Sequence, residues 1–245
     1  MRKASSLLAV LLLAVAAAAA ADTYSKIVDA PDRTADDKKN DEARKPAEVL
    51  RFLEVKPGMK VADIGAAGGY TTELLARAVG PKGVVYSQNT QAIIDKFIHD
   101  AWDKRLATPP NKNVVRVVRD YDDPLPPEAK NLDIVVNGFT YHDTVWLGVD
   151  RDKMNKVIFD ALKPGGLYVI FDHATKPGAG SADAKTLHRI EDKTVIDEVT
   201  KAGFKVARRG DFLKNPADAH DKNVFDDSIR GKTDRFAIAF VKPAK

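Results

Sequence analysis

The sequence lacks cysteine altogether, which excludes disulfide bonds, thiolate metal sites and cysteine nucleophiles. It also lacks a strong charge bias, because 39 basic and 35 acidic residues give a formal net charge of +4. No nucleic-acid partner is implied by so even a balance. Neither an internal repeat nor a low-complexity tract is found beyond the amino terminus. What is present is a hydrophobic content of 44% in 245 residues, enough to bury the core of one α/β domain.

The only long uncharged run is at the amino terminus. Arg2 and Lys3 precede residues 4–21, which are apolar at 7–15 and alanine-rich before Asp22. This pattern is typical of a signal peptide, so we expect residues 1–21 to be cleaved and the protein to be exported, with a periplasmic location. An uncleaved membrane anchor is the alternative, although the run is marginal in length for one. We expect no stable membrane insertion after cleavage.

Residues 61–75 read as a short apolar strand, a glycine-rich turn and the start of a helix. Gly65, Gly68 and Gly69 fall in the turn, and a second apolar strand, 83–89, ends at the polar Asn89. Glycine permits positive φ and close approach of a ligand to the backbone, and the following helix offers free N–H groups. A strand, turn and helix in this order, with a polar residue about 20 positions later, indicate a nucleotide-type cofactor site.

Short apolar runs alternate with helical stretches along the rest of the chain, which predicts a largely parallel sheet covered on both faces. We expect a charged, solvated arm over 22–45, one domain over 46–245, and a functional rim or lid in the polar segment 211–232. The expected strands are 61–65, 83–89, 114–118, 132–137, 167–171, 204–206 and 236–240, and the expected helices are 46–57, 71–79, 90–106 and 181–202.

Four motifs in order carry a family resemblance. Val-Ala-Asp-Ile-Gly at 61–65, Asp120-Tyr121, Leu-Asp-Ile-Val-Val at 132–136 and Leu-Lys-Pro-Gly-Gly at 162–166 resemble class I S-adenosylmethionine-dependent methyltransferases. Asp172-His173 and motifs at 187–190, 214–218 and 232–236 resemble a narrower group, predicted exported bacterial methyltransferases of unestablished substrate. The resemblance implies a Rossmann-like α/β fold with a seven-stranded, mostly parallel sheet, an antiparallel last strand and helices on both faces.

The resemblance also implies a set of residues for the cofactor, S-adenosyl-L-methionine. Asp63 would receive the ammonium group or orient the turn, and the backbone of the turn would approach the cofactor. Asn89 stands where the family usually has an acid for the ribose hydroxyls, Asp120 would accept the adenine amino group, and Asn137 would lie near the methyl group. The expected cofactor residues are therefore Asp63, Gly65, Ala66, Gly69, Tyr70, Asn89, Asp120, Tyr121 and Asn137.

Ordinary structural roles are open for several of these residues. Asn89 could only cap the next helix, and Asp120 could begin the turn at Asp122-Asp123-Pro124. Ala67 replaces the middle glycine of the family's usual Gly-x-Gly-x-Gly pattern. Its methyl group can be accommodated if φ is negative.

Histidines indicate the acceptor side of the site. His142 follows the fourth expected strand and His173 the fifth, so both belong at the carboxyl edge of the sheet, and we expect them to act as catalytic residues, with His142 as a general base. Hydrogen-bonded loop histidines are the alternative. We expect no metal, although Asp143, Asp172, His173 and His188 could converge on a divalent ion. Basic clusters at 44–46 and 230–235 could clamp an anionic substrate.

The expected function is methyl transfer from S-adenosyl-L-methionine to an unidentified small molecule. Two other classes fit parts of the pattern. A protein of the same fold could bind the cofactor or a nucleoside without catalysis, as a sensor. A nucleotide-dependent oxidoreductase would share the glycine-rich turn, but it would keep an acid at Asn89 and would not require Asp120.

Overall fold

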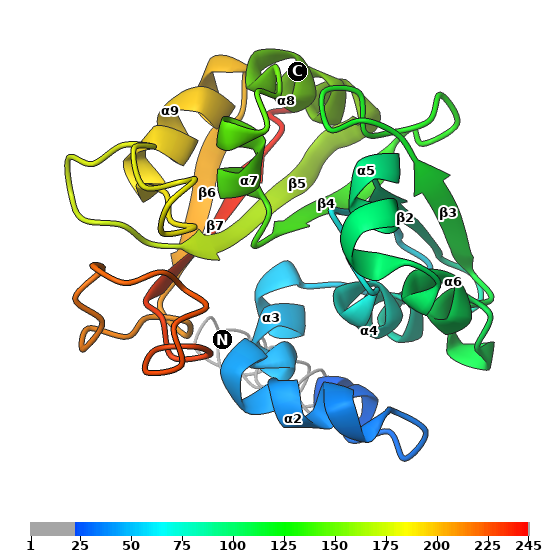
Figure 1. Ribbon diagram of the computed structural model, residues 1–245. Coiled ribbons are helices and arrows are strands. Elements are labelled where there is room, and N and C mark those ends of the chain that lie inside the picture. The colour runs from blue at the N-terminus through cyan, green and yellow to red at the C-terminus, as the bar shows by residue number, and fades with distance from the viewer. Residues whose placement is uncertain (1–22, 245) are drawn as a thin grey trace, which may run out of the picture.

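The computed structural model describes residues 23–244, so the expected signal peptide lies outside the described residues. Its centre is a seven-stranded sheet in the order β3-β2-β1-β4-β5-β7-β6 (Figure 1). All strands run parallel except β7, which is antiparallel to both β5 and β6. The predicted fold class is confirmed. The strands are β1 Lys60–Ile64, β2 Val84–Asn89, β3 Val114–Val118, β4 Leu132–Gly138, β5 Leu162–His173, β6 Lys205–Gly210 and β7 Arg235–Val241.

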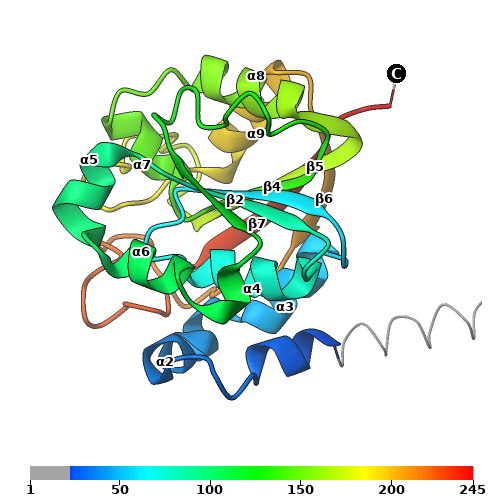
Figure 2. The same ribbon diagram turned by 90° about the vertical axis from the view of Figure 1, so that its right-hand side faces the viewer.

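Helices cover both faces of the sheet, with α8 and α9 on one side and α3 and α4 on the other (Figure 2). Each face of the sheet has its own hydrophobic core, and alternate residues of β5 pack into them. Tyr168 and Ile170 belong to one core, Val169 and Phe171 to the other. No helix in residues 23–244 is long and apolar enough to cross a membrane. The helices are α2 Ala35–Arg44, α3 Pro46–Leu53, α4 Tyr70–Val79, α5 Gln91–Ile93, the π-helix η1 Ile94–Ile98, α6 Ala101–Leu106, the 3-10 helix η2 Pro109–Asn111, α7 Tyr141–Trp146, α8 Arg151–Ala161 and α9 Asp192–Lys201.

The order of the strands creates a crevice beside β1. From β1 the chain moves outward through β2 to β3, and then returns to pair β4 with the opposite side of β1. The connections that leave β1 and β4 therefore diverge at the carboxyl edge of the sheet, which is where ligands bind in open α/β folds. The glycine turn follows β1 there, and the segment that carries His142 follows β4.

The charged segment 22–45 is not the solvated arm that its composition predicts. Residues 23–28 and α2 are helical, and α2 packs against the domain (Figure 1). The Arg105 guanidinium donates to both carboxylate oxygens of Asp37, at 2.6 and 2.9 Å, and Arg33 pairs in the same way with Asp41. Composition misleads here because the partner of Asp37 lies 68 residues away in the sequence.

Two predicted helices are shorter than expected. The stretch 90–106 is broken by η1 and by His99, which has a φ of 49°. In 181–202 only Asp192–Lys201 is an α-helix, because the carbonyls of Thr186 and Leu187 accept hydrogen bonds from Asn223 and Val224 instead of from the next helical turn. The sequence also gave no prediction of α8, which Asp150 caps by accepting from the Lys153 N–H.

Candidate active site

Three side chains hold the glycine turn that follows β1. The Gln88 amide oxygen accepts from the Gly65 N–H at 3.0 Å. Asn89 bonds Ala67 twice, accepting from its N–H at 2.9 Å and donating to its carbonyl at 3.0 Å. Arg105 donates from Nε to the Gly68 carbonyl at 2.6 Å. The turn is therefore fixed by the end of β2 and by α6, before any ligand is considered.

Ala67 has a φ of 48°, so the negative φ that would accommodate its methyl group without strain is not adopted. A left-handed alanine costs roughly 1–2 kcal/mol relative to the ordinary conformation. The two hydrogen bonds from Asn89 offset that cost, since both polar groups of its amide meet the backbone of the strained residue. Asn89 is fully buried with its amide occupied, so it positions the turn and is not the predicted ribose ligand.

Gly65 and Gly68 serve different purposes in the turn. Gly65 has a φ of 65°, and a Cβ there would lie 2.6 Å from the side chain of Thr140, in the β4–α7 connection. This glycine therefore lets the β1 and β4 connections touch. A Cβ at Gly68 would meet nothing within 4 Å, and Gly68 lines the cavity described below. The open position of the turn, where a ligand can approach the backbone, is thus Gly68.

Asp63 lies in the wall of the cavity below the glycine turn. Its carboxylate accepts a hydrogen bond of 2.6 Å from Thr72, which also contacts Ser87 at 2.8 Å. Burial raises the pKa of Asp63 to about 6, although Thr72 and Arg44 favour the ionised form. An acid held this way is ionised at neutral pH at a cost in stability, and a cationic ligand group would relieve that cost.

One cavity of about 950 Å³ joins the carboxyl ends of β1, β4 and β5. Its size lies at the upper end of the range for small-molecule sites, about 300–1,000 Å³. Five large apolar side chains are exposed in the described chain, and four of them line this cavity: Phe97, Trp146, Leu147 and Phe225. The polar segment 211–232, predicted to be a rim, supplies Phe225 and Arg230 to the wall.

The cavity wall includes some predicted cofactor residues and omits others. Asp63, Gly65, Ala66, Tyr70 and Tyr121 line it. Gly69, Asn89, Asp120 and Asn137 are not part of its wall.

The omissions have plain physical causes. Asp120 is exposed, and its carbonyl accepts from the Asp123 N–H at 3.2 Å, so it begins a turn; this bond involves its backbone and not its carboxylate, whose contact with adenine stays a prediction. Asn137 is fully buried within β4, one residue before Gly138, which does reach the cavity. Gly69 instead packs against Arg105, which a Cβ at this position would approach to 2.9 Å.

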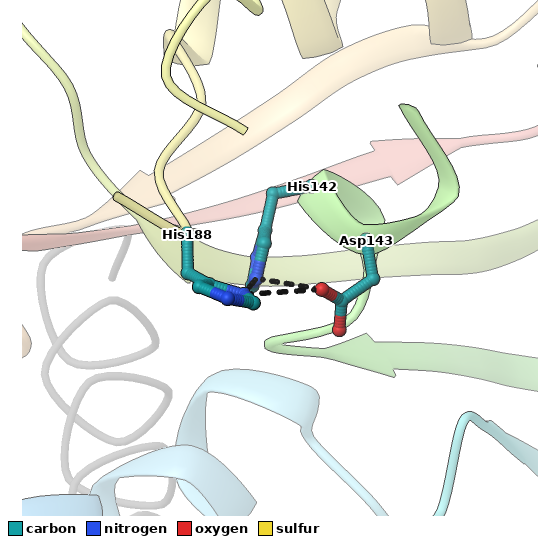
Figure 3. Close-up of side chains that lie close together, drawn as sticks. All are labelled: His142, Asp143 and His188. Carbon is teal, nitrogen blue, oxygen red and sulfur yellow. Dashed lines mark hydrogen bonds and ion pairs between the residues drawn. The ribbon is translucent and has the colours of Figure 1, made fainter. Parts of the chain in front are cut away.

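At the other end of the cavity three side chains meet, here named the histidine cluster: His142, Asp143 and His188 (Figure 3). His142 and Asp143 come from α7, and His188 from the segment before α9. The His142 Nε2 lies 3.2 Å from one carboxylate oxygen of Asp143 and 3.2 Å from the His188 Nδ1. The His188 Nδ1 lies 3.3 Å from the same Asp143 oxygen.

Asp172, near the end of β5, binds His142 on the side of the ring opposite to the histidine cluster. It accepts from the His142 ring at Nδ1, at 2.7 Å, and from the His142 backbone N–H at 2.8 Å. Burial lowers the pKa of His142, but the carboxylates of Asp172 and Asp143 outweigh it and raise the pKa to about 10. A pKa this high means that the His142 ring is protonated at neutral pH, and both of its nitrogens already have partners. His142 is therefore poorly suited to the predicted role of a general base.

His173 lies beside the cluster and also lines the cavity. Its ring is 6.0 Å from that of His142, and its Nδ1 is 2.8 Å from the Thr233 hydroxyl. Burial and the nearby cationic groups, His142 first, place the pKa of His173 well below its ordinary value. His173 is therefore neutral at pH 7 and is suited to hydrogen bonding.

Two arginines add positive charge to the wall. Arg235, buried, donates to the carbonyls of Ala43 and Thr233 and lies over the Phe139 ring at 5.8 Å, while burial lowers its pKa to about 10. Arg44 stacks on Tyr70 at 4.8 Å. Among residues 23–244, neither arginine has a carboxylate within salt-bridge distance. The basic cluster at 44–46 thus contributes one cation to the cavity, Arg44, and the cluster at 230–235 contributes two, Arg230 and Arg235.

The geometry agrees with a sequence comparison. The family model described as Protein-L-isoaspartate(D-aspartate) O-methyltransferase (PCMT) matches residues 22–207. The chain belongs to this family. The matched range contains the glycine turn and the whole histidine cluster, and it ends before the rim segment.

Individual relatives are more distant. A Protein-L-isoaspartate O-methyltransferase from Aeropyrum pernix is 31% identical over 122 residues, which cover 50% of this chain and 42% of that protein. The chain spans less than half the length of the curated relatives it matches.

Solved structures share the fold. A SAM dependent methyltransferase from Aquifex aeolicus superposes with a TM-score of 0.61 at 19% identity, covering 89% of this chain and 98% of that one. Fibrillarin from Aeropyrum pernix, crystallised with natively bound S-adenosyl-L-methionine, gives a TM-score of 0.54 at 16% identity and covers 82% and 76%. The predicted class I methyltransferase fold is confirmed, and S-adenosyl-L-methionine is the cofactor of this fold and family.

Proposed function

We propose that this protein transfers a methyl group from S-adenosyl-L-methionine to a small acceptor molecule with an apolar body. One observation carries the proposal: the glycine turn after β1 and the histidine cluster after β4 line the same cavity of about 950 Å³. A site with a cofactor-type turn at one end and polar side chains at the other can hold donor and acceptor in line.

The cofactor would lie over the glycine turn. In this arrangement the Asp63 carboxylate receives the ammonium group, since it lines the cavity and has only the Thr72 hydroxyl as a side-chain partner. The open side of Gly68 lets the ligand approach the backbone. Ile93, Ile98 and Tyr121 form an apolar part of the wall that suits the adenine ring.

The acceptor would lie between the histidine cluster and the apolar rim. The His188 ring lies 5.0 Å from the Phe225 ring and 6.3 Å from the Trp146 ring, measured between centroids, so aromatic groups surround the polar end. When bound there, S-adenosyl-L-methionine would supply its methyl group to a lone pair of the acceptor and leave as a neutral thioether that keeps the carbon–sulfur bonding electrons, while the acceptor's proton would pass to solvent. His142 and His173 are the residues that face the acceptor in this proposal.

A second acceptor class is favoured by the two arginines. Arg44 and Arg235 line the cavity without a carboxylate partner in the described residues, and guanidinium groups bind carboxylates well. An isoaspartyl side chain, the acceptor named in the family description, would present such a carboxylate. A peptide would have to enter past the apolar rim, whereas a small molecule would not.

The experiment that tests the proposal combines binding with turnover. The full chain is titrated with S-adenosyl-L-methionine and with oxidised and reduced dinucleotides, and is then incubated with labelled cofactor and either a small-molecule extract or an isoaspartyl peptide, with an aspartyl peptide as control. We expect cofactor binding and label transfer to an extract component. Transfer to the isoaspartyl peptide alone would favour the second acceptor class. Binding without any transfer would favour a sensor, and preference for a dinucleotide would refute both.

We also propose that the protein is exported, on the basis of Arg2, Lys3 and the uncharged run 4–21. Expression of the full chain in a bacterium, followed by fractionation and mass measurement, tests this. A periplasmic product whose amino terminus lies near Asp22 is the expected result. A cytosolic product that keeps Met1 or Arg2 would contradict it.

A further inference from the structure

The histidine cluster has the composition of a metal site. Two imidazole nitrogens and one carboxylate oxygen meet within 3.2–3.3 Å of one another, and each belongs to a different side chain. All three residues line the cavity, so the point where they meet is reached from its interior. We propose that His142, Asp143 and His188 bind one divalent transition-metal ion, with zinc as the best fit.

The distances fit a single ion. Zinc–nitrogen and zinc–oxygen bonds are about 2.0–2.2 Å long. Three atoms spaced 3.2–3.3 Å apart form a nearly equilateral triangle. An ion about 2.1 Å from each of them makes ligand–metal–ligand angles of about 100°, between the octahedral and tetrahedral values. It lies roughly 1 Å above the plane of the three atoms, which leaves its remaining positions free.

Asp172 supplies the support that a metal-binding histidine requires. Because Asp172 accepts from the Nδ1 side of the His142 ring, Nε2 is the nitrogen that can give up its proton and offer a lone pair to an ion. Nε2 is the atom that points at Asp143 and His188. Carboxylate groups behind ligating histidines fix the tautomer and the ring orientation in this way in known metal sites. Asp172 is fully buried, and it also binds the backbone of His142 and His173.

Hydrogen bonding alone explains the cluster less well. A proton on the His142 Nε2 can be shared between the Asp143 oxygen and the His188 Nδ1, since both atoms lie 3.2 Å away. The His188 Nδ1 and the Asp143 oxygen would then be two acceptors 3.3 Å apart with no proton between them. His188 also has a φ of 56°, a conformation that non-glycine residues adopt at a cost of roughly 1–3 kcal/mol and that clusters at functional sites. A shared ion accounts for the meeting of all three atoms.

The donor set selects the ion. Imidazole and carboxylate ligands suit zinc and other first-row divalent ions, whereas magnesium and calcium prefer oxygen ligands. Three protein ligands with open positions are the pattern of catalytic zinc sites rather than structural ones. This inference deepens the proposed function, because an acceptor oxygen bound to the ion would lose its proton more easily. Metal binding itself is measured without cofactor or acceptor, so the metal site and methyl transfer are tested independently of each other.

The test uses full-length protein without a histidine tag, stripped with a chelator and titrated calorimetrically with zinc chloride. We expect one ion per chain. We expect His142→Ala and Asp143→Asn each to weaken zinc binding at least about 100-fold, since each removes one of three ligands, and Asp172→Asn to weaken it about 10- to 100-fold. His188→Asn is a further ligand variant, because asparagine tolerates the left-handed backbone at this position.

His99→Ala is the matched control, because His99 is exposed and does not line the cavity. It should bind zinc as the unchanged chain does. Substitution with cobalt adds a spectroscopic measurement, since a low-symmetry site gives strong visible bands that His188→Asn should abolish. Stoichiometric zinc binding that all four variants retain, or the absence of binding in the folded parent chain, would overturn the proposal. Circular dichroism spectra identify any variant that fails to fold.

Discussion

The two ends of the cavity are built in different ways. The cofactor end depends on one local segment, β1 with its glycine turn, which three side chains from β2 and α6 hold through backbone groups. The histidine end depends on side chains from α7, the end of β5 and the segment before α9. A local end can be found in a sequence by its motif, whereas an end assembled from distant segments needs the fold.

Each end is also held by an arginine, half-buried at the cofactor end and fully buried at the histidine end. Arg105 connects α2, α4 and the glycine turn through Asp37, Glu73 and the Gly68 carbonyl. At the histidine end Arg189 pairs with Asp218 at 2.8 Å with both side chains almost fully buried. A substitution that breaks one network should therefore change stability and binding at its own end of the cavity.

The Asp218→Ala substitution should have the largest effect on stability. It leaves the Arg189 guanidinium buried without its partner and frees the Asp234 and His220 backbone N–H groups. Removing one partner of a buried ion pair costs about 3–5 kcal/mol. Chemical denaturation should show this loss, and zinc binding should weaken because Arg189 follows His188 directly. A loss under about 1 kcal/mol would show that the rim does not depend on this pair.

The Arg105→Ala substitution should destabilise the cofactor end instead. It leaves Asp37 and Glu73 without their shared cation, and these carboxylate side chains are only 9% and 8% exposed. We expect a loss of about 3 kcal/mol in the free energy of unfolding and weaker cofactor binding. Lys104→Ala is the control, because Lys104 and Asp100 form an exposed pair worth about 0–1 kcal/mol. Equal losses in the two variants would contradict the role given to Arg105.

The Asp63→Asn substitution should increase stability while it decreases binding. The folded-state pKa of about 6 lies above the ordinary value of 3.8, so the favourable contribution of Asp63 is present at low pH and is lost as the pH rises through 6. At pH 7.5 asparagine removes this penalty of roughly 2–3 kcal/mol. Thermal denaturation should show the gain, and calorimetry a cofactor affinity about 100-fold lower, as expected for a lost charged hydrogen bond. Lower stability together with unchanged binding would refute the assignment of Asp63.

The same acid predicts how cofactor binding depends on pH. Ionised Asp63 is needed to receive an ammonium group, and its pKa is raised to about 6 in the free protein. Below pH 6 the affinity for S-adenosyl-L-methionine should fall about tenfold per pH unit, because each unit adds about 1.4 kcal/mol to the cost of ionisation. Above pH 7 it should be constant. Asp63→Asn should remove this dependence. If the variant keeps it, the titrating group is not Asp63.

The sequence predicted the local features of the molecule and failed at the distant ones. The seven strands and the glycine turn follow from short-range patterns, which the structure confirms. Asn89 bonds the backbone of the turn, because a polar residue at a strand end can serve the backbone as readily as a ligand, and the adenine contact of Asp120 stays a prediction. Nothing local indicated that Gln88 would hold the turn.

The histidine end shows the same limit. His142 and His173 were expected to face the crevice because their strands neighbour each other in a parallel sheet, and both line the cavity. The approach of His188 depends on the rim segment, where the Asn223 side chain and the Val224 backbone N–H donate to the carbonyls of Thr186 and Leu187 in place of a helical turn. Such long-range hydrogen bonds leave no periodic signal in the sequence.

The most direct test of the central claim, that the cofactor lies over the glycine turn, is calorimetric titration of Gly68→Val with S-adenosyl-L-methionine beside the unchanged chain. The added side chain would point into open space, so the fold should be retained. We predict unfolding temperatures of the two chains within about 3 °C of each other, since the substitution changes little of the surface that is buried on folding. Affinity should fall at least about tenfold, a change of about 1.4 kcal/mol. Unchanged affinity in a folded Gly68→Val chain would contradict the account.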